Sequence, residues 1–233
     1  MLRKLIPILL AGLLLGLGFW LYRIYRPTLA RGQRVWQFFS DPASHPELVI
    51  AAGTRCGGAP FLFPTTGLVG FIWDDSFRPG HRHQGIDIFA RGGIGQTPVS
   101  AAYPGFLTRL PDWKASVIVR VPDDPLAPGR QIWLYYTHMA DADGNSFIAA
   151  DFPPGTSEKP IAAGTLLGYQ GDYSGDPNNP VGVHLHVSIV RDEGGHFTNE
   201  LDIRNTYDPS PYFGLALNAH DNPDKIPTCE AQP

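Results

Sequence analysis

Two histidines separated by a single residue, His184 and His186, lie in the run VHLHVSIV at 183–190. Val and Ile are β-branched, so this run is typical of a buried strand, in which alternate side chains point to opposite faces. The two imidazoles then share one face, while the aliphatic residues between and after them point into a core. Such a pair can serve one metal ion, or one metal ion and one reacting water molecule. Residues from other segments must complete the site.

The second segment with suitable chemistry is HQGID at 83–87. In an extended chain, residues four apart lie on the same side, so His83 and Asp87 can face one point while Ile86 and Ile88 face the core. Gly85 between them allows the close approach of another backbone or a ligand. A third piece is His138, at the end of the strand-like run 132–138.

Together these residues could form a catalytic zinc site, which takes three protein ligands and keeps a fourth position for water. His83, Asp87 and one histidine of the 184/186 pair supply that number and kind of ligand. Zinc would lower the pKa of its water to about 7 and polarise a substrate carbonyl. The remaining histidine and His138 would then take the water proton and stabilise the developing oxyanion. Each part alone is weaker evidence, because isolated histidines in strands are more often packed or solvated.

The segments between these residues predict a mainly β body. The 233 residues include 26 Gly and 23 Pro, which interrupt short apolar runs throughout the chain. This punctuation is typical of short strands joined by turns. We expect strands within 68–73, 97–102, 105–110, 116–121, 132–138, 163–168 and 183–190, with 116–121 and 132–138 forming a hairpin across the Pro-rich loop 122–129.

The amino terminus predicts a membrane segment. Residues 5–22 are apolar and uncharged, and basic residues flank them on both sides. This length is near the lower limit for a membrane-spanning helix and exceeds the usual core of a signal peptide. We therefore expect an uncleaved signal anchor at 1–26 in a single-pass membrane protein. The basic residues after it would favour a cytoplasmic body, but large domains translocate largely regardless of local charge, so we expect the body to be extracytoplasmic.

The rest of the chain divides into three parts in this interpretation. Residues 27–56 form a spacer, with one short helix near 35–39. Residues 57–214 form the folded domain, and residues 215–233 form a carboxy-terminal tail.

The charge of the body argues against nucleic acid as a partner. Six basic residues precede the first acidic one, Asp41, so the remainder carries 12 basic and 22 acidic residues, a net charge of −10. A domain this acidic binds polyanions poorly. The expected partner is cationic or neutral.

The two cysteines, Cys56 and Cys229, lie at opposite ends of the body. They are too far apart in sequence for a zinc knuckle, and in an oxidising compartment they could close a loop around the whole domain. Such a disulfide would add roughly 4–5 kcal/mol through loop entropy, less any strain. The alternative is two unpaired buried thiols.

Taken together, these motifs resemble those of the lysostaphin-like (LytM-type) zinc metallopeptidases, which cleave peptide cross-links of bacterial peptidoglycan. The resemblance runs from about residue 60 to 213 and leaves out the anchor, the spacer and the tail. Its matching segments, in order, are HQGIDI at 83–88, TPV at 97–99 followed by Ala101 and Gly105, YTH at 136–138, Ala163–Gly164 with Gly168, HLH at 184–186, and Asp208–Pro209 before Tyr212.

The resemblance implies a compact, mainly antiparallel β-sheet domain behind the N-terminal transmembrane helix. It implies one Zn²⁺ per chain, bound by His83, Asp87 and His186. His184 is then the expected general base and His138 the expected stabiliser of the tetrahedral intermediate, although the family leaves room to exchange these two roles. Val183, Val187 and Met139 depart from the residues usual in the family and alter packing only.

The resemblance also implies a function: a peptidoglycan endopeptidase, acting on stem peptides or cross-bridges. One rival is a non-catalytic, zinc-binding activator or scaffold of other cell-wall hydrolases, which the presence of all five residues disfavours. Another is a D-Ala-D-Ala carboxypeptidase, which would need a Glu-x-x-His segment that the chain lacks. His81, two residues before His83, is interpreted as a rim residue.

Overall fold

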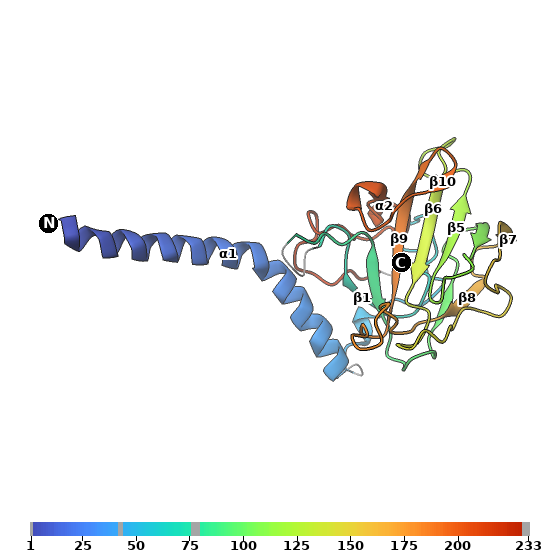
Figure 1. Ribbon diagram of the computed structural model, residues 1–233, viewed down its shortest axis with the longest axis horizontal. Coiled ribbons are helices and arrows are strands. Elements are labelled where there is room, and N and C mark those ends of the chain that lie inside the picture. The colour runs from blue at the N-terminus through green and yellow to red at the C-terminus, as the bar shows by residue number, and fades with distance from the viewer. Residues whose placement is uncertain (1, 42–43, 76–79, 230–233) are drawn as a thin grey trace.

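A large antiparallel sheet forms the centre of the computed structural model, which describes residues 2–41, 44–75 and 80–229, without the side chains of 2–9, 24–31 and 34. The elements in chain order are α1 (Leu2–Ser40), η2 (Pro46–Leu48), β1 (Leu68–Phe71), β2 (Ile86–Phe89), β3 (Pro98–Ser100), β4 (Gly105–Thr108), β5 (Val117–Val121), β6 (Ile132–Thr137), β7 (Lys159–Ile161), β8 (Leu166–Tyr169), β9 (His184–Glu193), β10 (His196–Phe197), η3 (Ile203–Asn205), β11 (Thr206–Tyr207) and α2 (Ser210–Phe213). The predicted mainly β, antiparallel fold is thus confirmed (Figure 1).

The large sheet has the strand order β1-β2-β9-β6-β5-β4-β7, and β10 and β11 also pair with β9. The predicted hairpin is present, since β5 and β6 pair over five positions. β3 and β8 form a separate two-stranded sheet. The turn at 101–104 therefore carries the chain from the small sheet to β4 in the large one.

Strict alternation of side chains divides the large sheet into two faces. On β9, Leu185, Val187 and Ile189 belong to the main hydrophobic core, as do Ile86 and Ile88 on β2. The small sheet contributes Val99 and Leu167 to the same core. The residues that alternate with these, including both histidines of β9, therefore lie on the opposite face.

The N-terminal helix is longer than expected. α1 continues past Pro27 to Ser40, through the first part of the predicted spacer and beyond the short helix expected at 35–39. Proline removes one backbone donor, and the residues after it are compatible with a helix. Val35 and Phe38 near its end are buried against Leu68 and Phe89 of the sheet. Figure 1 shows the helix bending and its first part extending away from the body.

The membrane anchor predicted at 1–26 is not supported. Within the residues that the structure describes, no helix is sufficiently long and apolar to cross a membrane. Residues 1–9 and 24–26 of the predicted anchor lie outside those whose side chains are described.

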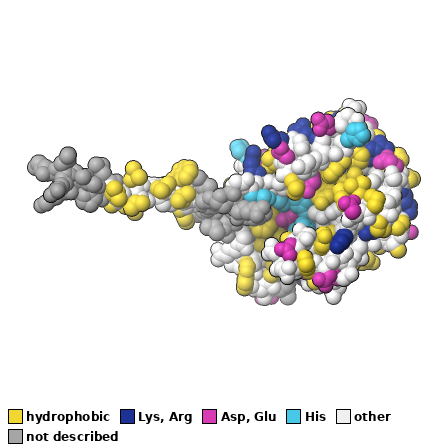
Figure 2. All heavy atoms as spheres, viewed as in Figure 1, with side chains coloured by type: hydrophobic (Ala, Val, Ile, Leu, Met, Phe, Trp, Pro, Cys, Tyr) yellow, Lys and Arg dark blue, Asp and Glu magenta, His cyan; other side chains and the backbone are white. Residues whose placement is uncertain are grey.

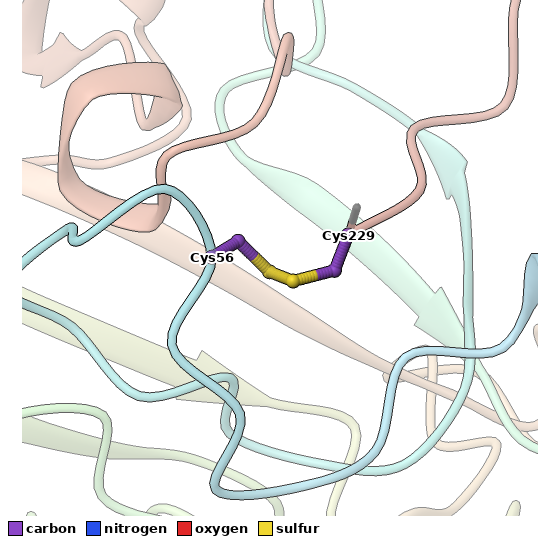
Figure 3. The surroundings of a disulfide bond; sticks show 2 residues. All are labelled: Cys56 and Cys229. Carbon is purple, nitrogen blue, oxygen red and sulfur yellow. A yellow bond between two sulfur atoms is a disulfide. The ribbon is translucent and has the colours of Figure 1, made fainter. Parts of the chain in front are cut away.

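A disulfide joins the two ends of the body, as the sequence favoured. Cys56 and Cys229 are bonded, with their Cα atoms 5.4 Å apart (Figure 3). Residues outside the predicted domain 57–214 also pack on it: Ile50 belongs to the main core, and Ile226 packs with the end of α1. The domain boundaries themselves stay a prediction.

Candidate metal centre

Three side chains from two segments converge on one point of the sheet face opposite the core. The Asp87 Oδ1 atom lies 3.1 Å from His83 Nε2 and 2.8 Å from His186 Nδ1, and the two nitrogens are 3.1 Å apart. All three residues are buried. The structure thus brings together the three residues that the sequence predicted as ligands, and this group could hold a metal ion.

The sheet register positions two of the three donors. Asp87 on β2 lies directly opposite His186 on β9. Gly85, just before β2, makes this pairing possible because a Cβ atom there would stand 2.1 Å from the Val187 carbonyl oxygen. The sequence argument for close backbone approach at Gly85 is therefore confirmed.

His83 lies before β2 and is held by the segment that follows β1. Its backbone N–H donates to the Asp75 carbonyl, and its carbonyl accepts from the Asp74 N–H, both at 2.8 Å. Its Nδ1 donates to the Ile72 carbonyl at 3.0 Å. A carbonyl can only accept, so the proton is fixed on Nδ1 and Nε2 of the neutral ring presents a lone pair to Asp87.

His186 directs its other ring nitrogen, Nδ1, at the site. Its Nε2 lies 2.7 Å from the hydroxyl of Ser188, two residues further on the same face of β9. With Nε2 donating to that hydroxyl, Nδ1 carries a lone pair directed at Asp87. Sequence reasoning did not single out Ser188, although the alternation of β9 places it beside His186.

Three acceptor atoms meeting at about 3 Å require a cation between them. Without a metal, a proton takes this role: burial opposes the charged form of His83, but the Asp87 carboxylate overrides it and raises the pKa of His83. Burial outweighs the same carboxylate at His186 and lowers its pKa to about 4. Asp87 keeps its negative charge despite burial, because the surrounding imidazoles hold its pKa well below the ordinary value. The donor set of two imidazoles and one carboxylate suits Zn²⁺.

The other two predicted residues form a second pair beside this group. The rings of His138 and His184 have centroids 4.4 Å apart, and His184 Nε2 lies 3.6 Å from Asp87 Oδ1. His138 follows β6 directly and has a positive φ of 71°, a conformation that non-glycine residues seldom adopt. Phe89, opposite His184 in the β2–β9 ladder, stacks on the His184 ring at 4.9 Å.

In both histidines of this pair, Nε2 carries a lone pair and no proton. His138 Nδ1 donates to the Tyr173 carbonyl at 2.6 Å, and His184 Nδ1 donates to the Gly182 carbonyl at 2.5 Å. Burial lowers the pKa of His138, and it lowers that of His184 to about 4. Both rings are therefore neutral at pH 7 and able to accept a proton at Nε2.

A cavity of about 400 Å³ opens onto all five residues. Its other lining residues are His81, Gln84, Ser116, Tyr135, Thr137, Tyr173, Ser174, Gly175, Val181, Glu200 and Leu201. Figure 2 shows histidine and acidic side chains side by side on the visible face, bordered by hydrophobic ones. No Lys or Arg is among the described residues that line this cavity.

Sequence reasoning placed some of these lining residues and missed others. His81 is at the cavity wall, with its ring centroid 6.5 Å from that of His83, and is not one of the three grouped donors. The loop 171–180 contributes Tyr173, Ser174 and Gly175 to the wall. Tyr135 and Glu200 were not anticipated, because neither lies in a recognisable motif.

No protein-family model and no curated protein matches the chain. Among solved structures, it is similar to the catalytic domain of lysostaphin from Staphylococcus simulans, at 18% identity and a TM-score of 0.41, over 62% of this chain and 88% of that domain. It is also similar to a candidate glycyl-glycine endopeptidase LytM from Ruminococcus gnavus, at 25% identity and a TM-score of 0.36, over 55% of this chain and 44% of that one. A third is the catalytic domain of the prophage-encoded protein EnpA from Enterococcus faecalis, at 22% identity and a TM-score of 0.38, over 64% of this chain and 95% of that one. These names are of the peptidase family that the sequence motifs resemble.

Proposed function

We propose that the protein is a zinc-dependent endopeptidase that hydrolyses peptide bonds in peptidoglycan. The observation that carries the proposal is the convergence of His83, Asp87 and His186 within one cavity, beside two neutral histidines that expose Nε2. The peptide class of the substrate rests on the resemblance of the motifs, and the chemistry rests on the geometry.

His83, Asp87 and His186 would hold the metal through the three atoms that already face one another. Bound Zn²⁺ would supply a Lewis acid for the peptide carbonyl and acidify the attacking water. The protein contributes the orientation of its ligands: the Ile72 carbonyl and the Ser188 hydroxyl fix which nitrogen of each imidazole is available.

His184 is proposed as the group that accepts the proton of the attacking water at Nε2. It is the nearer of the pair to the metal ligands, 3.6 Å from Asp87. Its neighbour His138 lowers the pKa of His184 further, after burial, because two positive charges this close oppose each other. The pair therefore accepts one proton but resists a second.

His138 is proposed to stabilise the negative charge that develops on the substrate carbonyl oxygen. In its neutral form its Nδ1 proton is committed to the Tyr173 carbonyl. When the proton that His184 has taken from the water passes to Nε2 of His138, His138 becomes a donor at the cavity. The same proton can then pass to the leaving amine. One shared proton thus serves both halves of the reaction.

The test is mass spectrometry of purified muropeptides after incubation with the full chain and equimolar zinc. The expected result is a new pair of fragments that together contain one additional water, from cleavage at one type of peptide bond. His184→Ala is the matched control, because it is expected to bind zinc and not to cleave. Intact muropeptides after incubation with folded, zinc-loaded wild type would refute the proposed activity.

We also propose that the body works outside the cytoplasm. The Cys56–Cys229 disulfide supports this, since such bonds persist in oxidising compartments. Alkylation of intact cells and then of the denatured protein measures its redox state. Two free thiols in the protein from cells would contradict the proposed location.

A further inference from the structure

Glu200 is an acidic residue at the wall of the metal cavity with no role in the chemistry described above. It lies between β10 and η3, and it lines the same cavity as His83, Asp87 and His186. The cavity also contains Tyr135, whose pKa is raised by burial and then by the charge of Glu200. Glu200 and Tyr135 are therefore neighbours within the cavity.

The loop that carries Glu200 is anchored to the segment that carries His83. The Gln84 side-chain amide donates to the Leu201 carbonyl at 2.8 Å, which ties the residue after Glu200 to the residue after His83. On the other side, the Asn199 side chain accepts from the Leu201 N–H at 3.1 Å, and the Asn199 carbonyl accepts from the Asn205 amide at 2.8 Å. Glu200 thus has a fixed place on the His83 side of the cavity.

No Lys or Arg side chain pairs with the Glu200 carboxyl among the described residues of the cavity. Across the part of the chain that the structure describes, no hydrogen bond or ion pair reaches this carboxyl group, and no Lys or Arg lines the cavity. Burial raises the pKa of Glu200 to about 7, with His83 as the opposing influence. A partly buried carboxylate without a counterion is unfavourable until a cation reaches it.

We infer that Glu200 binds an ammonium group of the peptide substrate on the His83 side of the metal, and so selects peptides with a free amine near the scissile bond. The inference rests on the proposed peptidase function and deepens it. An ammonium would complete a charge-assisted pair with the carboxylate. The Tyr135 ring in the same cavity is a further favourable neighbour for a cation.

The alternative role for this carboxylate is general base. Two neutral histidines already expose Nε2 on the cavity, and Phe89 and the Gly182 carbonyl hold His184 in place for that role. Glu200 is carried by the loop tied to Gln84, the residue after His83, and among the described residues no hydrogen bond or ion pair links it to His184 or His138. Glu200 is therefore assigned to recognition, and a loss of turnover on every substrate alike would reassign it.

The test compares one set of dimeric muropeptides before and after acetylation of their free amines. For wild type, we expect kcat/KM to be at least about tenfold higher for the amine form, which is the effect of one hydrogen bond to a charged group. Glu200→Gln keeps the shape and removes the charge, and is expected to bring this ratio close to one, mainly by lowering kcat/KM for the amine form. Circular dichroism checks that the variant is folded.

Asp202→Asn is the matched control. Asp202 lies in the same loop, pairs with the exposed Arg204 and does not line the cavity, and asparagine also caps a helix start. This variant is expected to keep the wild-type ratio. The inference is overturned if wild type shows no preference for the amine form, or if Glu200→Gln slows both forms equally.

Binding of the same two muropeptide forms, measured by calorimetry, separates this inference from the proposed function. If wild type cleaves neither form but binds the amine form more tightly, and Glu200→Gln abolishes that difference, the peptidase proposal fails and the recognition role stands. If cleavage occurs but neither kcat/KM nor the binding constant distinguishes the two forms, the recognition role fails and the peptidase proposal stands.

Discussion

Asp87 lies directly opposite His186 in the β2–β9 ladder, with Asp87 Oδ1 2.8 Å from His186 Nδ1. The two residues are 99 positions apart in sequence, and the register of one strand pair alone brings them together. A shift of either strand by one residue would turn that strand's side chain, Asp87 or His186, into the core and separate the pair. The pairing of β2 with β9 thus sets the positions of Asp87 and His186, and the adjacent loops supply the other residues of the site.

Asp87→Ala should remove zinc and activity together. The substitution leaves two buried imidazoles without the carboxylate that draws a cation to them, and only two of the three donors. Elemental analysis after gel filtration is expected to give about one zinc per wild-type chain and well under one tenth for the variant. His83→Ala should behave in the same way.

Asp208→Ala offers a control for the loss of an aspartate away from the cavity. Its carboxylate accepts hydrogen bonds from the Ser210 backbone N–H and the Asn218 side-chain amide near α2, so the variant is expected to lose stability but to retain zinc. Retention of stoichiometric zinc by folded Asp87→Ala would contradict the assignment of this residue as a ligand.

His184→Ala should keep the zinc and lose turnover. His184 is not one of the three converging donors, and its Nε2 is held for proton transfer. We expect kcat to fall about 10²- to 10⁴-fold, the usual contribution of a positioned general base. Zinc content and muropeptide cleavage rate, measured on the same preparation, check both halves of this prediction.

The double variant His138→Ala/His184→Ala should be little slower than His184→Ala alone. The two rings lie 4.4 Å apart and are proposed to share one proton, so removing the second partner should cost little once the first is gone. If the fold-losses in rate of the two single variants multiply in the double variant, the two residues act independently.

The sequence predicted the site because it is built mainly from strand alternation. His184, His186 and Asp87 share one face by period-two geometry, and Leu185 and Ile88 occupy the other, as the core confirms. Ser188 was within reach of the same reasoning. Glu200 was not, because its place depends on a loop fixed by a hydrogen bond between Gln84 and Leu201, 117 residues apart.

The regions least well predicted are those where tertiary contacts override local signals. The N-terminal segment was expected to end at residue 26, yet α1 continues past Pro27 to Ser40 because Val35 and Phe38 pack on the sheet. The separate pairing of β3 with β8 also follows from long-range contacts. Neither proline positions nor periodicity contains that information.

Activity should fall at low pH because zinc dissociates, and not because the proposed base His184 becomes protonated. The pKa of His184 is lowered to about 4, so this base stays neutral well below pH 6. The pKa of His83 is raised, so protons begin to compete with zinc at a higher pH than for an ordinary histidine. Zinc affinity should therefore decrease about tenfold per pH unit below that pKa. Raising the free zinc concentration tenfold should move the acid limb down by about one pH unit, and a limb that does not move would contradict this account.

Gly85→Ala should destabilise the fold and weaken zinc binding at the same time. A Cβ atom at this position would stand 2.1 Å from the Val187 carbonyl oxygen and 2.7 Å from Ser188 Oγ, so β2 and β9 must separate. We expect a loss of about 1–3 kcal/mol in the free energy of unfolding, measured in urea. Gly32→Ala is the control, because among the described residues beyond its chain neighbours and its own helix backbone no atom lies within 4 Å of its Cβ position, and alanine favours the helix there. Because Ser188 orients His186, the strain at Gly85 should also lower zinc affinity, and unchanged affinity together with unchanged stability would show that the close approach at Gly85 is not required.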